Sequence, residues 1–122
     1  MNSFEVYQDP DGQAQFYFSH SDKQFTTGVL VLHPGKELAK HNRPLAVENL
    51  IQIAGKCVMK VYSSETEYEN KALKVGDSLS MAKGVYHIHS NPFQEISVTF
   101  FKAEGDITKI MDNLRKALVK IK

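Results

Sequence analysis

Short runs of alternating apolar and polar residues, separated by turn-forming residues, make up most of the chain. Residues 4–8 and 14–19 flank Asp9-Pro10-Asp11-Gly12-Gln13, a connection typical of a hairpin. Further strands are predicted at residues 25–32, 47–53, 57–62, 79–82, 86–90 and 95–102. Many short strands at regular spacing predict a sandwich or a barrel.

The last segment changes to a helical period. After Gly105, apolar residues recur at helical spacing and lysines and an arginine fall mainly on the other side; the apolar ones are Ile107, Ile110, Met111, Leu114, Leu118 and Ile121. Asp106 is a candidate N-cap. We expect an amphipathic helix over about residues 106–121, packed outside the sheet or across a dimer rather than bound to a membrane.

Composition narrows the class of protein. The 122 residues are 42% hydrophobic and 24% charged with a net charge of +1, which predicts a single soluble domain over residues 1–122 and no nucleic-acid partner. The barrel should occupy about residues 1–103. No run approaches the roughly 18 apolar residues of a membrane span. The single cysteine, Cys57, alternates with Met59 and Val61, so we expect a buried thiol and a cytoplasmic location.

The residues that suggest chemistry begin between two glycines, in residues 35–55. His41 and Arg43 are two apart, so on an extended chain they point to the same face. Glu48 begins an apolar run, and a charged group there is costly to bury without a partner. The partner could be a metal ion or the guanidinium of Arg43.

These residues stand at the spacings of the first motif of the cupin superfamily. That motif runs glycine, five residues, His-x-His, three or four residues, glutamate, six residues, glycine. The corresponding residues here are Gly35, His41, Arg43, Glu48 and Gly55. Every spacing agrees, and arginine stands in place of the second histidine.

Residues 76–91 resemble the second cupin motif, which runs glycine, five residues, Pro-x-Gly, two residues, histidine, three residues, asparagine. The corresponding residues are Gly76, Ala82, Gly84, His87 and Asn91, with alanine in place of the proline. The resemblance implies an all-β, antiparallel jelly-roll barrel, often dimeric, with a site inside its mouth. The fold we expect is this barrel followed by the C-terminal helix.

The resemblance also implies one divalent transition metal, such as iron, manganese, zinc or nickel, bound by three histidines and the glutamate. Arg43 cannot be a ligand, because a guanidinium keeps its proton in a protein. His41, Glu48 and His87 remain, and two histidines with one carboxylate form a known ferrous-iron ligand set. His89 lies two residues beyond His87 on the same strand face, so its inward rotation would restore a fourth ligand.

Three roles for Arg43 stay open. It could form a bidentate ion pair with Glu48 in a metal-free barrel, where the histidines would serve as donors and acceptors. It could grip the carboxylate or phosphate of a small molecule. It could also stand beside a metal site completed by His89. Gln52, four residues after Glu48, is expected on the same strand face and could add a hydrogen bond to the ligand.

Two classes of function follow from the resemblance. The first is a small cupin that binds an anionic small molecule and a metal, and that would act as a dioxygenase or isomerase if it is an enzyme. The second is a metal-free, non-catalytic dimerisation or binding module, since residues 83–91 resemble a pattern in the C-terminal domain of centromere protein C. A homodimer is expected in either class.

Overall fold

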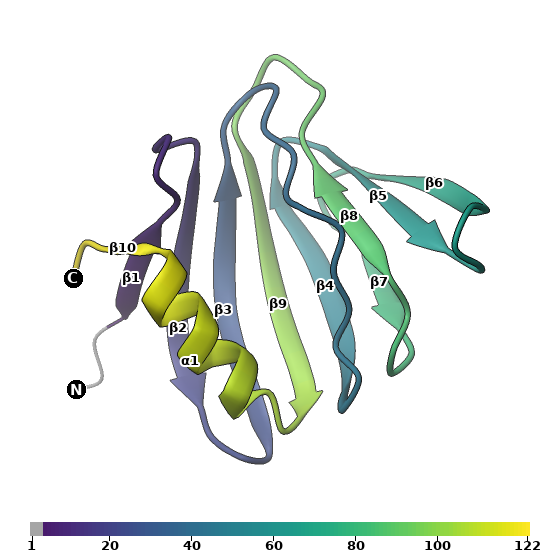
Figure 1. The fold of residues 1–122 in the computed structure, drawn as a ribbon. Coiled ribbons are helices and arrows are strands. Elements are labelled where there is room, and N and C mark those ends of the chain that lie inside the picture. Colours follow the sequence, from purple (N-terminus) through teal and green to yellow (C-terminus); the bar gives the residue numbers. More distant parts are fainter. Residues whose placement is uncertain (1–3) are drawn as a thin grey trace.

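The computed structural model describes residues 4–122, which form ten strands and one helix (Figure 1). The strands are β1 (Glu5–Gln8), β2 (Ala14–Ser21), β3 (Phe25–Leu32), β4 (Ala46–Ala54), β5 (Cys57–Tyr62), β6 (Tyr68–Leu73), β7 (Ser78–Met81), β8 (His87–Ser90), β9 (Ser97–Gly105) and β10 (Val119–Lys120), and the helix is α1 (Thr108–Ala117). The predicted hairpin and the strands at residues 25–32 and 57–62 are confirmed.

The strands form two antiparallel sheets. The larger sheet has the order β10-β1-β2-β3-β9-β4-β7, and the smaller has the order β6-β5-β8. Backbone bridges from Glu37 to Ser90 and from His41 to His87 align the segment before β4 with the free edge of β8. This is the predicted all-β architecture, with strands distant in sequence adjacent in each sheet.

Glycines allow the sharp turns that return the chain between these strands. Gly55 lies between β4 and β5 with φ at 63°, and Gly76 lies between β6 and β7 with φ at 91°. L-residues with a side chain rarely adopt such values. A Cβ at Gly55 would also clash with the carbonyl oxygen of Ile96. Both glycines therefore perform the turn role that their spacing predicted.

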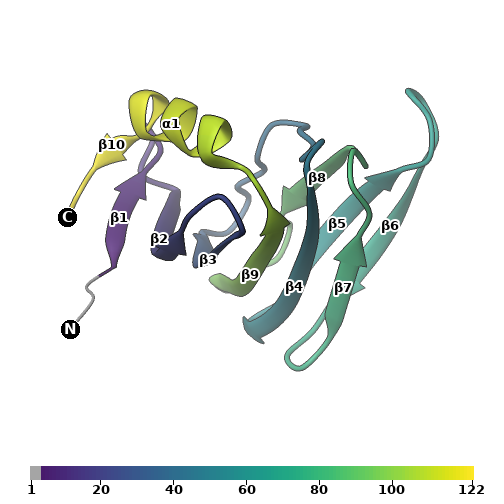
Figure 2. The same cartoon turned by 90° about the horizontal axis from the view of Figure 1, so that it is seen from below.

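Helix α1 lies on the inner face of the large sheet, not outside it as the sequence led us to expect. Ile107 and Met111 are buried in one cluster with Phe18 and Ala103. Figure 2 shows α1 and the small sheet on the same face of the large sheet, the helix over β1–β3 and the small sheet nearer β4. The small sheet is too narrow to cover the whole inner face, so the helix covers the remainder.

The helix is also shorter than expected. It ends at Ala117, and Val119–Lys120 pair with Tyr7 and Gln8 because β1 offers an unpaired strand edge. At its start the N-cap is Ile107 rather than the expected Asp106, although Asp106 Oδ1 accepts a hydrogen bond from the backbone nitrogen of Thr108 at 3.0 Å. No helix within residues 4–122 has the length and apolar character needed to span a membrane.

Candidate metal and ligand site

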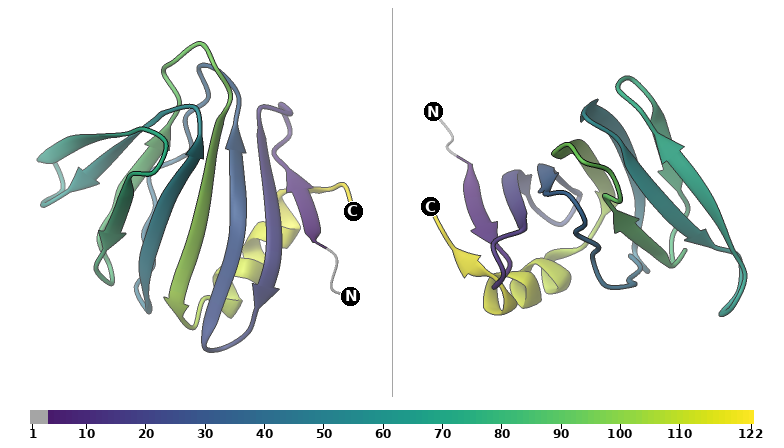
Figure 3. Two further views of the ribbon diagram at one scale, coloured as in Figure 1. Left: turned by 180° about the vertical axis from the view of Figure 1, so that it is seen from behind. Right: turned by 90° about the horizontal axis from the view of Figure 1, so that it is seen from above.

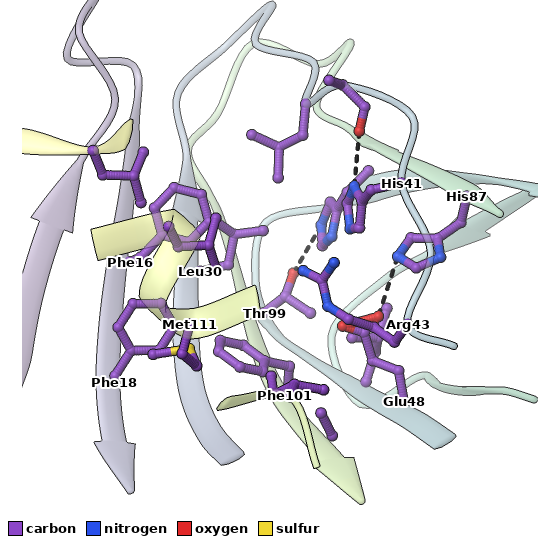
Figure 4. Close-up of a pocket in the computed structure, with 18 of the residues that line it drawn as sticks. Phe16, Phe18, Leu30, His41, Arg43, Glu48, His87, Thr99, Phe101 and Met111 are labelled. Carbon is purple, nitrogen blue, oxygen red and sulfur yellow. Dashed lines mark hydrogen bonds and ion pairs between the residues drawn. The ribbon is translucent and has the colours of Figure 1, made fainter. Parts of the chain in front are cut away.

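A cavity of about 300 Å³ lies between the inner face of the large sheet, the small sheet and α1. Its walls include five of the six residues predicted for the site: His41, Arg43, Glu48, His87 and His89. They come from β4, from β8 and from the segment before β4 (Figure 4). The structure therefore gathers the polar residues of both motifs around one cavity.

Strand pairing determines how these side chains meet. Glu48 points inward because β4 alternates, with Ala46 and Leu50 buried on the same face. His41 and His87 exchange two backbone hydrogen bonds, of 3.0 and 2.9 Å, which place their rings 4.3 Å apart between centroids. The bridge thus brings the two imidazole rings together near the carboxylate of Glu48.

Three of the predicted ligands form one compact group. His41, Glu48 and His87 each offer a ligand atom, and these three atoms lie within 4.8 Å of one another. Ligand atoms with bonds of about 2.1 Å to one tetrahedral metal ion stand about 3.4 Å apart. A contraction of up to about 1.4 Å would therefore bring the group to metal-binding distances.

Hydrogen bonds orient both imidazole rings of this group. Nδ1 of His41 donates to the carbonyl oxygen of Ala39 at 2.7 Å, and Nδ1 of His87 donates to that of Val85 at 3.2 Å. Because a carbonyl oxygen only accepts, these contacts place a proton on Nδ1 of each ring, so Nε2 is the nitrogen available to a ligand or a second proton. Burial, with the charges of Arg43 and His87, lowers the pKa of His41 to about 4, so its ring is neutral at pH 7.

The carboxylate of Glu48 is buried and incompletely partnered. Its Oε2 lies 3.1 Å from Nε2 of His87, but the alignment is not that of a hydrogen bond. Among the buried polar side-chain atoms of residues 4–122, it alone has no hydrogen-bond partner. Burial opposes its charge, but His87, Arg43 and His41 together outweigh burial and hold the pKa of Glu48 at about 2.

These donors fit a divalent transition metal. With the Nδ1 protons committed to backbone carbonyls, Nε2 of His87 faces an anionic oxygen of Glu48, and this contact is favourable only with a proton or a metal cation between the two atoms. Two imidazole nitrogens and one carboxylate are a ligand set for ferrous iron and related metals. The backbone carbonyls provide the outer hydrogen bonds that such ligands ordinarily have.

Arg43 lies in the cavity wall without a contacting carboxylate. No acidic group within residues 4–122 forms an ion pair with it inside 4.0 Å, and Glu48 makes its ion-pair contact with His87 instead. The one hydrogen bond of the Arg43 side chain runs from Nη1 to the carbonyl oxygen of Asn42 at 3.2 Å. Burial lowers the pKa of Arg43, opposed by the charge of Glu48. The bidentate Arg43–Glu48 pair is therefore not formed.

His89 and Gln52 lie deeper in the barrel. His89 is buried and faces the cavity, but it is outside the three-ligand group, and its Nε2 lies 3.4 Å from Oγ1 of Thr99. Gln52 is buried on the same face of β4 as Glu48, as expected, but it is not among the residues that line the cavity. Its side chain bonds Thr99, Ser97 and the carbonyl oxygen of Ala54.

Thr99 is the contributor to this site that sequence reasoning missed. It connects Gln52 to His89, since its hydroxyl lies 2.7 Å from Oε1 of Gln52. The signal was present in the alternation of β9. Ser97 and Thr99 form a polar pair on one face of the strand, and that face proves to be the buried one.

Comparisons with known proteins identify the fold. No family model matches the sequence, and no curated protein matches it significantly. Among solved structures, the Cnp3 cupin domain of Schizosaccharomyces pombe superposes with a TM-score of 0.69 at 17% identity, over 90% of this chain and 73% of that one. The chain has the cupin fold.

Other cupin-fold structures also resemble it in architecture. A CENP-C domain of Drosophila melanogaster matches with a TM-score of 0.73 and 16% identity, over 85% of this chain and 77% of that one. An oxalate oxidase in complex with glycolate matches with a TM-score of 0.63 and 14% identity, over 67% of this chain. The match spans only 42% of the oxidase chain. At these identities the likeness concerns the fold alone.

Proposed function

We propose that this cupin binds a small anionic molecule inside its barrel, beside one divalent transition metal held by His41, Glu48 and His87. The observation that carries the proposal is the grouping of three ligand atoms within 4.8 Å around a buried carboxylate oxygen that has no hydrogen-bond partner. Arg43 supplies the positive charge that binds the anion. A third histidine, His89, supports the site from the deeper wall of the cavity.

When bound, the metal supplies a Lewis acid with open coordination positions. The chain's own residues do the remaining work. The carbonyls of Ala39 and Val85 orient the two imidazole rings, and Arg43 positions an anionic ligand. The oxalate oxidase of similar fold was captured with glycolate, a small organic acid, which supports this class of ligand for the present barrel.

Metal analysis tests the ligand assignment. The purified chain should carry about one metal ion per chain after equilibration with Fe²⁺, Mn²⁺, Zn²⁺ or Ni²⁺ and removal of the excess. His41→Ala and His87→Ala should each abolish stoichiometric binding, because either change leaves only two ligands. Elemental analysis by mass spectrometry gives the stoichiometry, and a rise in the melting temperature on metal addition reports binding independently.

His20→Ala is the matched control for these variants. His20 is exposed, bonds Asp22 at 2.8 Å and lies outside the cavity, so its loss should leave metal content unchanged. Stoichiometric metal that survives both His41→Ala and His87→Ala would overturn the ligand assignment. Absence of metal from the folded wild-type chain under all four conditions would overturn the metal proposal itself.

We also propose that the chain forms a homodimer through the outer face of the large sheet. Seen from behind, this face carries no helix, and α1 lies on its far side (Figure 3, left). A row of paired residues, Tyr17, Val29, Phe100 and Ile51, crosses it. None of the four is charged, so the row can pack against its own copy about a twofold axis. The CENP-C domain of similar fold has been captured bound to a protein, CAL1, which supports a protein-binding role as a second candidate function.

A further inference from the structure

The cavity has two chemically different ends. Its lining residues divide into a polar group, His41, Arg43, Glu48 and His87, and an apolar group, Phe16, Phe18, Leu30 and Met111. Figure 4 shows the polar group on one side, the apolar group on the other beside α1, and Thr99 and Phe101 of β9 between them. A ligand that fills this space therefore meets charge at one end and hydrocarbon at the other.

We propose that the cavity takes a small monocarboxylate with an apolar chain or ring, its carboxylate at Arg43 and its apolar body against α1. The inference rests on the proposed function and adds the class of ligand. It also assigns a role to the C-terminal helix, whose residues form the wall that contacts the apolar body.

The polar end selects a carboxylate over other head groups. The Arg43 guanidinium has lost much of its hydration, and no acidic side chain of residues 4–122 contacts it within 4.0 Å. A carboxylate accepts two parallel hydrogen bonds from such a group and neutralises its charge. A hydroxyl cannot neutralise it, and an ammonium group is repelled. The acidic residue Asp9 also borders the cavity, but it pairs with Lys36 and accepts from the backbone of Ala14.

The apolar end selects a hydrocarbon body. Helix α1 contributes Leu114, which is half-buried, and Met111, which is fully buried and packs in one cluster with Phe18 and Phe101. Each ligand methylene that is buried against such a surface makes the binding free energy more favourable by about 0.8 kcal/mol, which raises affinity about fourfold. At the ~30 Å³ that one water occupies in the liquid, the cavity of about 300 Å³ accommodates about ten non-hydrogen atoms. Hexanoate and phenylpropanoate are of this size.

A chain-length series tests the inference. Affinities of acetate, butanoate and hexanoate are measured by titration calorimetry on the full-length chain, with hexanol and hexylamine as head-group controls. We expect affinity to rise about fourfold per methylene from acetate to hexanoate, and both controls to bind at least about tenfold more weakly than hexanoate. Equal affinities for acetate and hexanoate, or hexanol binding as tightly as hexanoate, would overturn the proposal.

Two tryptophan variants locate the apolar body. The chain contains no tryptophan, so Leu114→Trp places a single fluorophore in the cavity wall and Ala117→Trp places one on the exposed side of the same helix. Hexanoate should shift the emission of the first and not of the second, and Leu114→Trp should lower hexanoate affinity about tenfold while acetate affinity stays unchanged. An equal response of both variants contradicts the assignment.

Metal content separates this inference from the proposed function. Both tryptophan variants should bind metal as the wild type does, since α1 holds none of the three ligands. If the wild-type chain binds metal but its carboxylate affinity does not rise from acetate to hexanoate, only the proposed ligand class is overturned. If His41→Ala and His87→Ala lose metal binding while the wild-type carboxylate affinity rises with chain length, the results support both the metal site and the ligand class.

Discussion

Arg43 places a permanent positive charge on the wall of the cavity that holds His41, Glu48 and His87. In the motif that the sequence resembles, this position holds a metal ligand. Here the side chain cannot bind a cation, and its burial leaves it suited to an anion. The same residue therefore weakens the attraction of the site for a metal and strengthens its attraction for a carboxylate.

Arg43→Met should separate these two effects. Removing the charge should raise the affinity for Zn²⁺ about tenfold, because like charges repel across a few ångströms of protein, and should lower acetate affinity by at least that factor. Calorimetry with each probe measures both. Lys40→Met is the control, since Lys40 is exposed and stacks on Tyr62 outside the cavity. A Zn²⁺ affinity unchanged by Arg43→Met would show that the charge lies too far from the metal to matter.

The buried side chain of Gln52 is held by hydrogen bonds to Ser97 and Thr99. Gln52→Ala should lower the free energy of unfolding by about 3 kcal/mol, because it removes the hydrogen bonds from Gln52 to Thr99 and Ser97 and opens a cavity. Urea denaturation measures the loss. Metal content should not change, and Gln24→Ala, at an exposed position, should have little effect. A loss of carboxylate affinity in a folded Gln52→Ala variant would instead support the ligand-binding role that the sequence suggested.

At the scale of elements, α1 is attached to the barrel by one apolar face and one ion pair. Arg115 donates to both carboxylate oxygens of Glu5 on β1, at 2.7 and 3.1 Å. The hydrogen bond from Arg115 lowers the pKa of Glu5 to about 2. This pair holds the helix next to the edge strand where the chain continues into β10, and it thereby positions the apolar wall of the cavity.

Glu5→Gln should weaken this attachment in a pH-dependent way. Both side chains are about one third exposed, so the loss at pH 7 should be about 1 kcal/mol in the free energy of unfolding. Because the folded pKa lies below the ordinary 4.5, the carboxylate stabilises the fold fully above about pH 4.5 and ceases to do so as the pH falls towards 2. The difference between wild type and variant, followed by urea denaturation, should therefore shrink over that range.

Glu95→Gln provides the control for this pH dependence. Glu95 is exposed and forms no ion pair with any residue from 4 to 122. Its substitution should leave the free energy of unfolding nearly unchanged at every pH. A Glu5→Gln effect that is constant between pH 7 and pH 3 would mean that packing, rather than the charge, attaches the helix.

At the scale of the whole molecule, the large sheet has two unlike faces. Its inner face is covered by α1 and the small sheet (Figure 2), whereas its outer face presents Ile51, Ile53 and Ile96, each nearly half exposed. Apolar side chains gathered on one sheet face commonly mark an interface. The proposed dimer would cover this face and leave the cavity on the opposite side of the sheet accessible.

Ile51→Glu should convert the proposed dimer to a monomer. A charge in the centre of an apolar interface remains unpaired on association, which costs several kcal/mol and weakens dimerisation at least about a hundredfold. Analytical ultracentrifugation at micromolar concentration measures the mass. Val75→Glu is the control, since Val75 is exposed in the turn between β6 and β7. A monomeric wild-type chain under these conditions contradicts the dimer.

Local pattern and motif spacing were sufficient to predict most of the strands, the turn glycines and five of the six residues expected at the site, but not β6 or β10. Alternation places Glu48 and Gln52 on one side of β4, and the spacing of two residues places His87 and His89 on one side of β8. These relations depend only on the period of a strand, so they follow from sequence alone. The cupin-like spacings then indicated which strands carry the site.

Contacts between distant segments were decided only by the tertiary structure. Whether Glu48 meets Arg43 or His87 depends on the bridge between His41 and β8, which is not encoded in the local pattern of either segment. The amphipathic pattern predicted that α1 packs against the sheet. Its position on the inner face of the large sheet was decided by the part of that face that the small sheet leaves uncovered (Figure 2). The polar face of β9 became the buried one because Gln52 on β4 supplies its hydrogen bonds. A strand's period determines which side chains share a face, and only the packed sheets determine what that face meets.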